Sequence, residues 1–242
     1  MKQQQFKNAG NGTQHEDKAV SLFQNLGFHA ERVGGRGDTP DIYVWDGNLK
    51  YGAECKNSLK NSASYVSFTL KYDHKTDVLS YTTKTTCEKL KKAKDRLFNS
   101  IKEDIKPYFK NTEIKEVWCD KAEKYYEIYV PMQQNKSKSL RKEIIAKKDG
   151  IVVDSSLVYD VLVAKGNDYL VIDSSIIPLV DDYLHLPKLL TKKNVPNYFY
   201  ARVRSCKRGK STGQQHSLKL FIYCGGYKNN KPKINSKVRI ER

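Results

Sequence analysis

The sequence lacks the features that mark exported, membrane-spanning or zinc-binding proteins. It has five cysteines, an odd number, and no two of them form a C-x-x-C pair. This pattern argues against both a disulfide framework and a zinc site, so we expect reduced thiols. There is no run of 18 apolar residues and no signal-peptide pattern after Met1. We therefore expect no membrane partner and a cytoplasmic location.

The motifs of several common enzyme classes are also missing. The five histidines are scattered without the H-x-x-x-H spacing of a helical metal site, and no G-x-S-x-G motif occurs. Gly34, Gly35 and Gly37 lie close together, but the segment has neither the G-x-G-x-x-G spacing nor the Lys-Ser/Thr of a P-loop. Metallopeptidase, serine-hydrolase and nucleotide-binding chemistry therefore have no motif in this chain.

What the sequence has in excess is positive charge. Lysine and arginine number 44 against 27 acidic residues, which gives a formal net charge of +17 over 242 residues. Such an excess repels itself unless a polyanion neutralises it, and nucleic acid is the commonest candidate. An acidic protein or an anionic membrane would satisfy the same charge. The length allows one large domain or two small ones.

The N-terminal quarter predicts a helix, a glycine-rich loop and a hairpin. Thr13 to Glu16 has the form of a capping box, and apolar residues follow at helical spacing until Gly27. A short strand is expected over 28–33. Asp46-Gly47-Asn48 is a strong turn signal, so we predict a hairpin with arms over 42–45 and 49–53. Glu16 is then a capping carboxylate, a residue beside a functional site, or both.

Three charged residues lie on this predicted hairpin. Asp41 follows Pro40 at the head of the first arm, and strand alternation turns Glu54 and Lys56 to one face and Cys55 to the other. Pairing of the arms brings Asp41 close to Glu54. Two like charges about 4 Å apart repel by roughly 4 kcal/mol at an effective dielectric near 20. A hard divalent cation such as Mg²⁺ removes this repulsion, since carboxylate and carbonyl oxygens are its preferred ligands.

The remainder of the chain predicts one long helix, one short helix and many strands. The helices are expected over 85–106 and 140–148, and the polar linker 133–139 is our candidate boundary. It divides the chain into a core, 1–132, and a basic β-rich region, 133–242, which either stands apart or packs with the core as one domain. The apolar, strand-like runs are 65–70, 113–119, 124–130, 151–153, 157–164, 169–172, 198–206 and 217–224.

Several basic residues are candidates for contact with DNA. Arg36 in the glycine-rich loop can pair with a phosphate, whereas the neighbouring Asp38 is expected to cap the loop. A second group lies on a hairpin, because two-stranded basic ribbons fit the major groove. The alternative is an ordinary solvated hairpin. This second group consists of Arg202, Arg204, Lys207, Arg208 and Lys210.

These residues resemble the PD-(D/E)xK nuclease superfamily, which includes type II restriction endonucleases and archaeal Holliday-junction resolvases. The resemblance rests on Glu16 in an N-terminal helix, on Pro40-Asp41 at the head of a strand, and on Glu54-Cys55-Lys56 in the next. It covers about a quarter of the chain. It implies an α/β (mixed α+β) fold, with a restriction-endonuclease-like core sheet flanked by helices, and Mg²⁺-dependent hydrolysis of phosphodiester bonds.

The resemblance also implies a role for each matched residue. Asp41 and Glu54 would ligate Mg²⁺, for which Mn²⁺ would substitute, and the main-chain carbonyl of Cys55 is a possible further ligand. Lys56 would lie near the attacking water and stabilise charge on phosphorus. Glu16 would help to hold the metal shell or a second ion.

Three functional hypotheses follow. The first is a site-specific endonuclease that cuts double-stranded DNA, for which a homodimer is expected because two-fold DNA favours a two-fold protein. The second is a structure-selective nuclease that acts on DNA junctions. The third is a non-catalytic DNA-binding protein, in which Asp41, Glu54 and Lys56 form an ordinary salt-bridge cluster.

Overall fold

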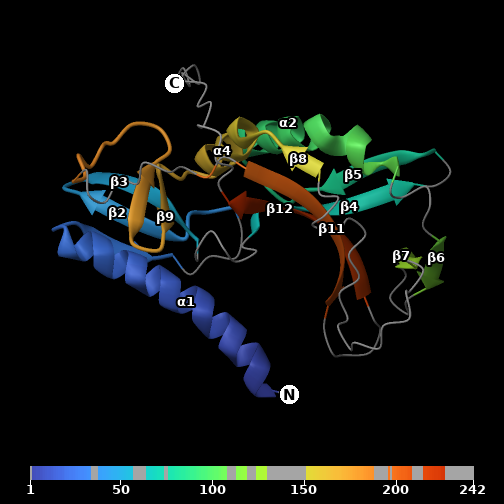
Figure 1. Cartoon of the computed structure of the whole chain (residues 1–242), viewed down its shortest axis with the longest axis horizontal. Coiled ribbons are helices and arrows are strands. Elements are labelled where there is room, and N and C mark those ends of the chain that lie inside the picture. The colour runs from blue at the N-terminus through green and yellow to red at the C-terminus, as the bar shows by residue number, and fades with distance from the viewer. Residues whose placement is uncertain are drawn as a thin grey trace.

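A computed structural model shows a mixed α+β fold with two five-stranded sheets (Figure 1). This agrees with the fold class expected from the sequence. The described helices are α1 (Lys2–Asn25), α2 (Glu88–Ile105) and α4 (Ser155–Ala164). The structure describes residues 2–33, 38–56, 64–73, 76–107, 113–118, 124–129, 151–187, 196, 198–208 and 215–226.

The first sheet has the strand order β1-β2-β3-β9-β10. All neighbouring strands are antiparallel except β3 and β9, which run parallel. A parallel pair needs a crossover connection, and α4 lies in that connection directly before β9. The strands are β1 (His29–Arg32), β2 (Ile42–Asp46), β3 (Leu49–Lys56), β9 (Tyr169–Ile172) and β10 (Ser175–Pro178).

The second sheet is antiparallel throughout and has the order β5-β4-β12-β11-β8. A separate two-stranded sheet is formed by β6 and β7. Both five-stranded sheets combine strands from before and after residue 132, so the expected domain boundary does not separate one sheet from the other. The strands are β4 (Ser64–Asp73), β5 (Val78–Thr82), β6 (Glu113–Trp118), β7 (Lys124–Tyr129), β8 (Ile151–Val153), β11 (Tyr198–Arg208) and β12 (Gln215–Gly226).

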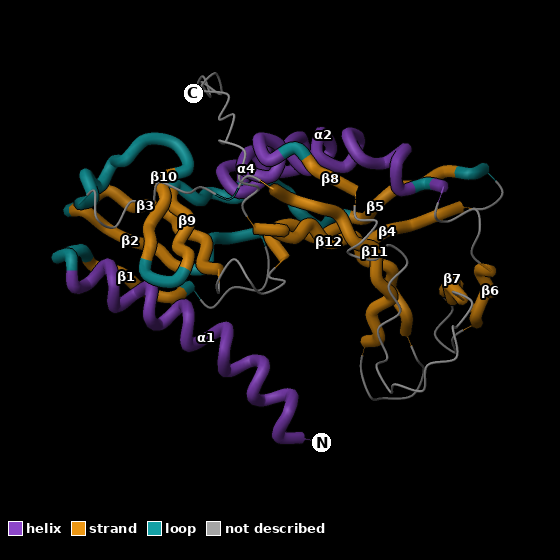
Figure 2. The backbone as a smooth tube through the Cα atoms, in the orientation of Figure 1, coloured by secondary structure: helices purple, strands orange, loops and turns teal. Residues whose placement is uncertain are grey.

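Figure 2 shows α1 beside the first sheet and α2 and α4 beside the second, and two apolar cores lie between these helices and the sheets. Ala19 and Phe23 of α1 are buried with Ile42 and Val44 of β2, so α1 covers one face of the first sheet. The larger core joins α2 and α4 to the second sheet and also includes Leu170 of β9. Because α4 belongs to this core and leads directly into β9, it links the two sheets.

The structure corrects three predictions about helices. Residues 157–164 form most of α4 rather than a strand; a short apolar run does not distinguish the two, and the Asp154 side chain accepts a hydrogen bond from the Ser156 N–H as an N-cap. The first helix begins at Lys2, so Thr13 is not its start and Glu16 lies in its interior. The second begins at Glu88 rather than residue 85.

Some of the other predictions concern described residues, and others concern residues that the structure does not describe. The hairpin of β2 and β3 is confirmed, as is the pairing of β11 with β12. The expected linker, 133–139, and short helix, 140–148, lie outside the described residues. Among the described cysteines, Cys55, Cys87 and Cys224 are free thiols. No helix in the described ranges is both long and apolar enough to span a bilayer.

Candidate active site

The open end of the β2–β3 hairpin places Asp41 beside β3. The two strands pair from Asp46 opposite Leu49 to Ile42 opposite Ala53. One residue further, the Asp41 N–H donates to the Ala53 carbonyl at 3.1 Å, and Asp41 Oδ2 accepts from the Cys55 N–H at 2.8 Å. The Asp41 side chain therefore takes the place of the next rung of the sheet, which holds its carboxylate next to Glu54.

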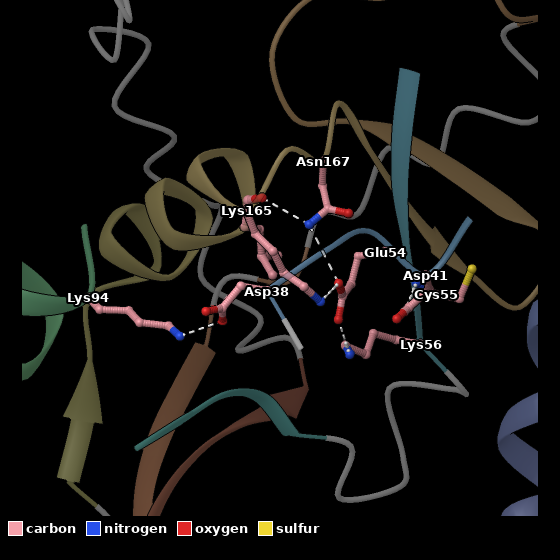
Figure 3. Close-up of polar contacts among 9 residues, drawn as sticks. Asp38, Asp41, Glu54, Cys55, Lys56, Lys94, Lys165 and Asn167 are labelled. Atoms are coloured by element: carbon pink, nitrogen blue, oxygen red, sulfur yellow. Dashed lines mark hydrogen bonds and ion pairs between the residues drawn. The ribbon is translucent and has the colours of Figure 1, made fainter. Parts of the chain in front are cut away.

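Glu54 is a buried carboxylate held by two ammonium groups (Figure 3). Only 3% of the residue is exposed to solvent. Lys56 Nζ donates to Oε1, and Lys165 Nζ donates to Oε2 at 2.7 Å. The Asn167 amide makes a longer contact with Oε2, at 3.5 Å. Residues from β3 and from the α4–β9 turn therefore meet at one carboxylate.

Burial and charge move the pKa values of these groups in different directions. Burial raises the pKa of Asp41, and the nearby charge of Glu54 raises it further. Burial would also raise the pKa of Glu54, but the ammonium groups of Lys56 and Lys165 outweigh burial and leave it lowered. Burial would lower the pKa of Lys56, whereas Glu54 and Asp41 raise it overall. Lys56 is therefore an ammonium ion at neutral pH.

Glu16 lies at the edge of the same acidic group. Burial raises the pKa of its carboxyl, and the charge of Asp41 adds to the rise. Its carboxylate is 3.8 Å from the Arg32 guanidinium. Helix α1 therefore carries Glu16 into the electrostatic field of Asp41, although Glu16 does not cap the helix.

Cys55 presents its backbone, not its thiol, to the Asp41 edge. The thiol packs against the core between α1 and the first sheet, and burial raises its pKa well above the ordinary value. The N–H and C=O of a strand residue point to the same side, so the Cys55 carbonyl faces the edge to which its N–H donates. This carbonyl oxygen lies next to Asp41 and could serve as a metal ligand.

Asp38 connects the loop before Asp41 to α2. Its carboxylate accepts from Lys94 Nζ at 2.8 Å. Burial would raise the pKa of Asp38, but the hydrogen bond from Lys94 outweighs burial and lowers it. The structure shows an ion pair between the loop and a helix packed on the second sheet, whereas the expected capping concerns residues 34–37, which lie outside the described residues.

The sequence analysis missed Lys165 and Asn167, because no local pattern assigns the α4–β9 turn to the hairpin. The turn is fixed by Gly52, whose N–H donates to Asp168 Oδ2 at 3.0 Å and whose carbonyl accepts from the Asp168 N–H at 2.8 Å. A Cβ at Gly52 would lie 2.1 Å from the Gly166 carbonyl oxygen. Only glycine allows this approach of the two backbones.

Among the candidate DNA contacts, Arg202 has a side chain in the described part of the structure. Arg202 is half-buried in β11, and its guanidinium carbon lies 5.4 Å from the ring centroid of Tyr223 in β12. Arg36 and Lys210 lie outside the described residues. Arg204, Lys207 and Arg208 lie in β11, but their side chains are outside the described part of the structure.

The oxygen atoms at the hairpin fit a hard divalent cation if a backbone carbonyl binds it together with the carboxylate side chains. Within the described part of the chain, no group of three or more His, Cys, Asp and Glu side chains is arranged to hold a metal ion. Two carboxylates, Asp41 and Glu54, and the Cys55 carbonyl supply oxygens of the kind Mg²⁺ prefers. Burial and the charge of Glu54 raise the pKa of Asp41, so a cation bound beside it would favour its ionised form.

A comparison of the chain with protein-family models, with curated proteins and with solved structures finds no match. A functional assignment therefore depends on the residues of this chain alone. The Asp41–Glu54–Lys56 group is the part of the described structure that offers a specific chemistry.

Proposed function

We propose that this chain is a Mg²⁺-dependent endonuclease that hydrolyses phosphodiester bonds of double-stranded DNA, with the first sheet as a restriction-endonuclease-like core. One observation carries the proposal. Asp41 and Glu54 are held side by side at the open end of a hairpin, with an ammonium group in contact with Glu54. Carboxylates and a lysine in this arrangement suit the cleavage of a phosphate diester.

Each residue has a distinct role in this proposal. Asp41, Glu54 and the Cys55 carbonyl would hold the cation, and Glu16 would add negative charge around it. A divalent cation bound there supplies positive charge against the phosphate oxygens and favours hydroxide over water at neutral pH. Water adds to phosphorus as the bond to one sugar oxygen breaks, which leaves a phosphomonoester and a hydroxyl. Lys56, charged at neutral pH, stabilises the negative charge that grows on the phosphate.

The surface of the chain supports a polyanionic substrate. The net charge is +17, and the solvent side of α2 carries exposed basic residues. Lys94 of the same helix contacts Asp38, which is three residues before Asp41, so this basic helix lies beside the site. We propose that DNA phosphates contact α2 and that a homodimer cuts both strands. The exposed basic residues on this helix, which we propose make these contacts, are Lys89, Lys91, Lys92 and Arg96; its exposed acidic residues are Glu88, Glu103 and Asp104.

One observation favours a second candidate, a DNA-binding protein without catalysis. Both oxygens of Glu54 accept from ammonium groups, as in a salt-bridge cluster whose only role is structural. Buried ion pairs are weak sources of stability, however, because desolvation offsets most of the attraction. The junction-selective nuclease uses the same site and differs only in its substrate.

The test is incubation of the full chain with mixed plasmid DNA and Mg²⁺ or Mn²⁺, followed by sequencing of the fragment ends. We expect cleavage by the wild type, and none by Glu54→Gln or Lys56→Ala, while both variants still bind DNA. Lys106→Met is the matched control, since Lys106 pairs with Asp77 away from the site.

Cleavage retained by Glu54→Gln would contradict the assignment. No turnover on linear or branched DNA with either cation would favour the non-catalytic protein. Preference for branched over linear DNA would identify the junction-selective enzyme.

A further inference from the structure

The α4–β9 turn supplies a second cation to the candidate site, and the roles assigned above leave it unused. Lys165 is the C-cap residue of α4, and its ammonium nitrogen is 2.7 Å from Glu54 Oε2. The two residues are 111 positions apart in the chain. Figure 3 shows Lys165 and Lys56 reaching Glu54 from different elements.

The fold holds this turn in place firmly. Gly166 has a φ of +94°, a left-handed conformation that favours glycine, and its carbonyl packs onto Gly52. Asp168 exchanges two hydrogen bonds with Gly52, one from its backbone and one to its side chain. Lys165 therefore reaches the site from a rigid base, and only its long side chain is free to change direction.

Lys165 lies within electrostatic reach of three carboxylates. Its charge acts to lower the pKa values of Asp38, Asp41 and Glu54. Three ammonium groups, those of Lys56, Lys94 and Lys165, face these three carboxylates, so the group is close to neutral as it stands. A divalent cation held by Asp41 and Glu54 would give the group a surplus of positive charge.

Asn167 places a buried acceptor beside Glu54. It and Glu54 are the two buried polar or charged residues in the described structure, and they touch. Its Nδ2 donates to the Leu162 carbonyl at 2.9 Å, so the amide cannot flip without placing two oxygens together. Its Oδ1 is then buried without a hydrogen-bond partner. A water molecule bound to a cation would be a suitable donor to this atom.

We propose that Lys165 is a substrate-binding residue that exchanges partners. Without a cation it neutralises Glu54, and once a divalent cation takes that Glu54 oxygen it contacts a phosphate of the nucleic acid. This inference rests on the proposed nuclease function. It makes binding of the cation and of nucleic acid cooperative, and such coupling is reciprocal.

Lys165 is a better candidate for this exchange than Lys56. Lys56 lies two residues from Glu54 on the same face of β3, and its ammonium is 5.6 Å from the ring centroid of Tyr65. It is also drawn to Asp41, which raises its pKa together with Glu54. Lys165 belongs to a different element, and its flexible four-carbon stem lets the ammonium turn toward a bound phosphate.

The experiment compares full-length wild type, Lys165→Met and Lys106→Met. Lys106 is the C-cap residue of α2 and donates to Asp77 at 2.9 Å, which makes it a matched helix-end lysine away from the site. Affinity for Ca²⁺ is measured by calorimetry without DNA. Affinity for a short fluorescent duplex is measured by anisotropy with and without Ca²⁺, and a gel checks that the duplex stays intact.

We expect Ca²⁺ to tighten duplex binding by the wild type about tenfold, within the range typical of coupled sites. Lys165→Met should lose most of this coupling and yet bind Ca²⁺ several-fold more tightly than the wild type, because no ammonium competes for Glu54. Lys106→Met should behave as the wild type. Lys165→Arg should restore the coupling, since it keeps the positive charge.

Coupling that survives in Lys165→Met, or weaker Ca²⁺ binding by that variant, would overturn the inference. Circular dichroism checks that the variant folds, and Lys165→Gln takes its place if it does not. If the wild type cuts DNA but Lys165→Met keeps the coupling, the role of Lys165 is wrong and the proposed nuclease function stands. If the wild type binds no Ca²⁺, both the role of Lys165 and the proposed function are contradicted.

Discussion

The two large sheets differ in what they bury. The core between the second sheet and its helices consists of apolar side chains, such as Phe68, Leu97 and Ile222. In the first sheet, the face of β3 that meets the α4–β9 turn buries Glu54 and Asn167, the buried polar or charged residues of the described structure. The second sheet is built for packing, whereas the first contains a polar centre that packing does not require.

The free energies of apolar burial and of a buried ion pair differ in size. Full burial of one large apolar side chain contributes about 1.5–3 kcal/mol, so the second sheet supplies much of the free energy of unfolding. A buried ion pair contributes little in net terms, because desolvation offsets the attraction, and well-packed apolar residues often replace it without loss. The charges around Glu54 therefore add little net stability to the fold.

The largest expected effect on stability lies in the second core. Leu97 on α2 is fully buried, so Leu97→Ala should lower the free energy of unfolding by about 2–5 kcal/mol through lost packing and a cavity. Cleavage per folded molecule should be unchanged. Urea unfolding and the plasmid assay measure both, and Asn99→Ala on the exposed face of the same helix is the control. Loss of cleavage by a fully folded Leu97→Ala would break the distinction between the two sheets.

The next largest effect lies where the α4–β9 turn meets the hairpin. Gly52→Ala places a methyl group 2.1 Å from the Gly166 carbonyl oxygen, so the two backbones must separate. We expect a loss of about 1–3 kcal/mol, as for overpacked cores, together with reduced cleavage because Lys165 moves away from Glu54. Gly47→Asn in the hairpin turn is the control, since nothing lies within 4 Å there and asparagine tolerates a positive φ. Wild-type stability in Gly52→Ala would show that the contact is dispensable.

The sequence predicts the hairpin because its signals are local. Asp46-Gly47-Asn48 forms the turn, and strand alternation puts Glu54 and Lys56 on one face. The parallel pairing of β3 with β9 has no such signal, since it joins segments more than a hundred residues apart, as Glu54 and Lys165 are. Lys165 and Asn167 are therefore invisible before the fold is known.

The apolar run that forms α4 has no period that separates a helix from a strand, and the prediction of a strand there is wrong. Residues 157–164 are mostly apolar, so neither a two-residue nor a 3.6-residue period stands out. Asp154-Ser155-Ser156 before the run was the available signal, because an Asp N-cap marks the start of a helix. This error hid the crossover that joins the two sheets.

The smallest expected effect on stability concerns Asp41, where a substitution should stabilise the fold. Burial and Glu54 raise the pKa of Asp41 in the folded protein, so the ionised carboxylate lowers stability at neutral pH. Asp41→Asn keeps an acceptor for the Cys55 N–H and should raise the free energy of unfolding by about 1 kcal/mol. The gain should shrink as the pH falls through the raised pKa toward 3.8, where wild-type Asp41 becomes protonated.

Glu54→Gln sharpens this test because it should lower the free energy of unfolding, whereas Asp41→Asn should raise it. The pKa of Glu54 is lowered in the folded protein, so its charge adds stability above pH 4.5 that is lost as the pH falls through the lowered value. Urea unfolding across this pH range measures both variants. A destabilised Asp41→Asn at neutral pH would contradict the electrostatic account of the site.

The most direct test of the site is calorimetric titration of Mn²⁺ into folded wild type and folded Asp41→Asn. Because the substitution should stabilise the fold, lost binding cannot be ascribed to unfolding. We predict saturable Mn²⁺ binding by the wild type and none by Asp41→Asn. Equal binding by both proteins, or no binding by either, would contradict the claim that Asp41 and Glu54 together hold a divalent cation.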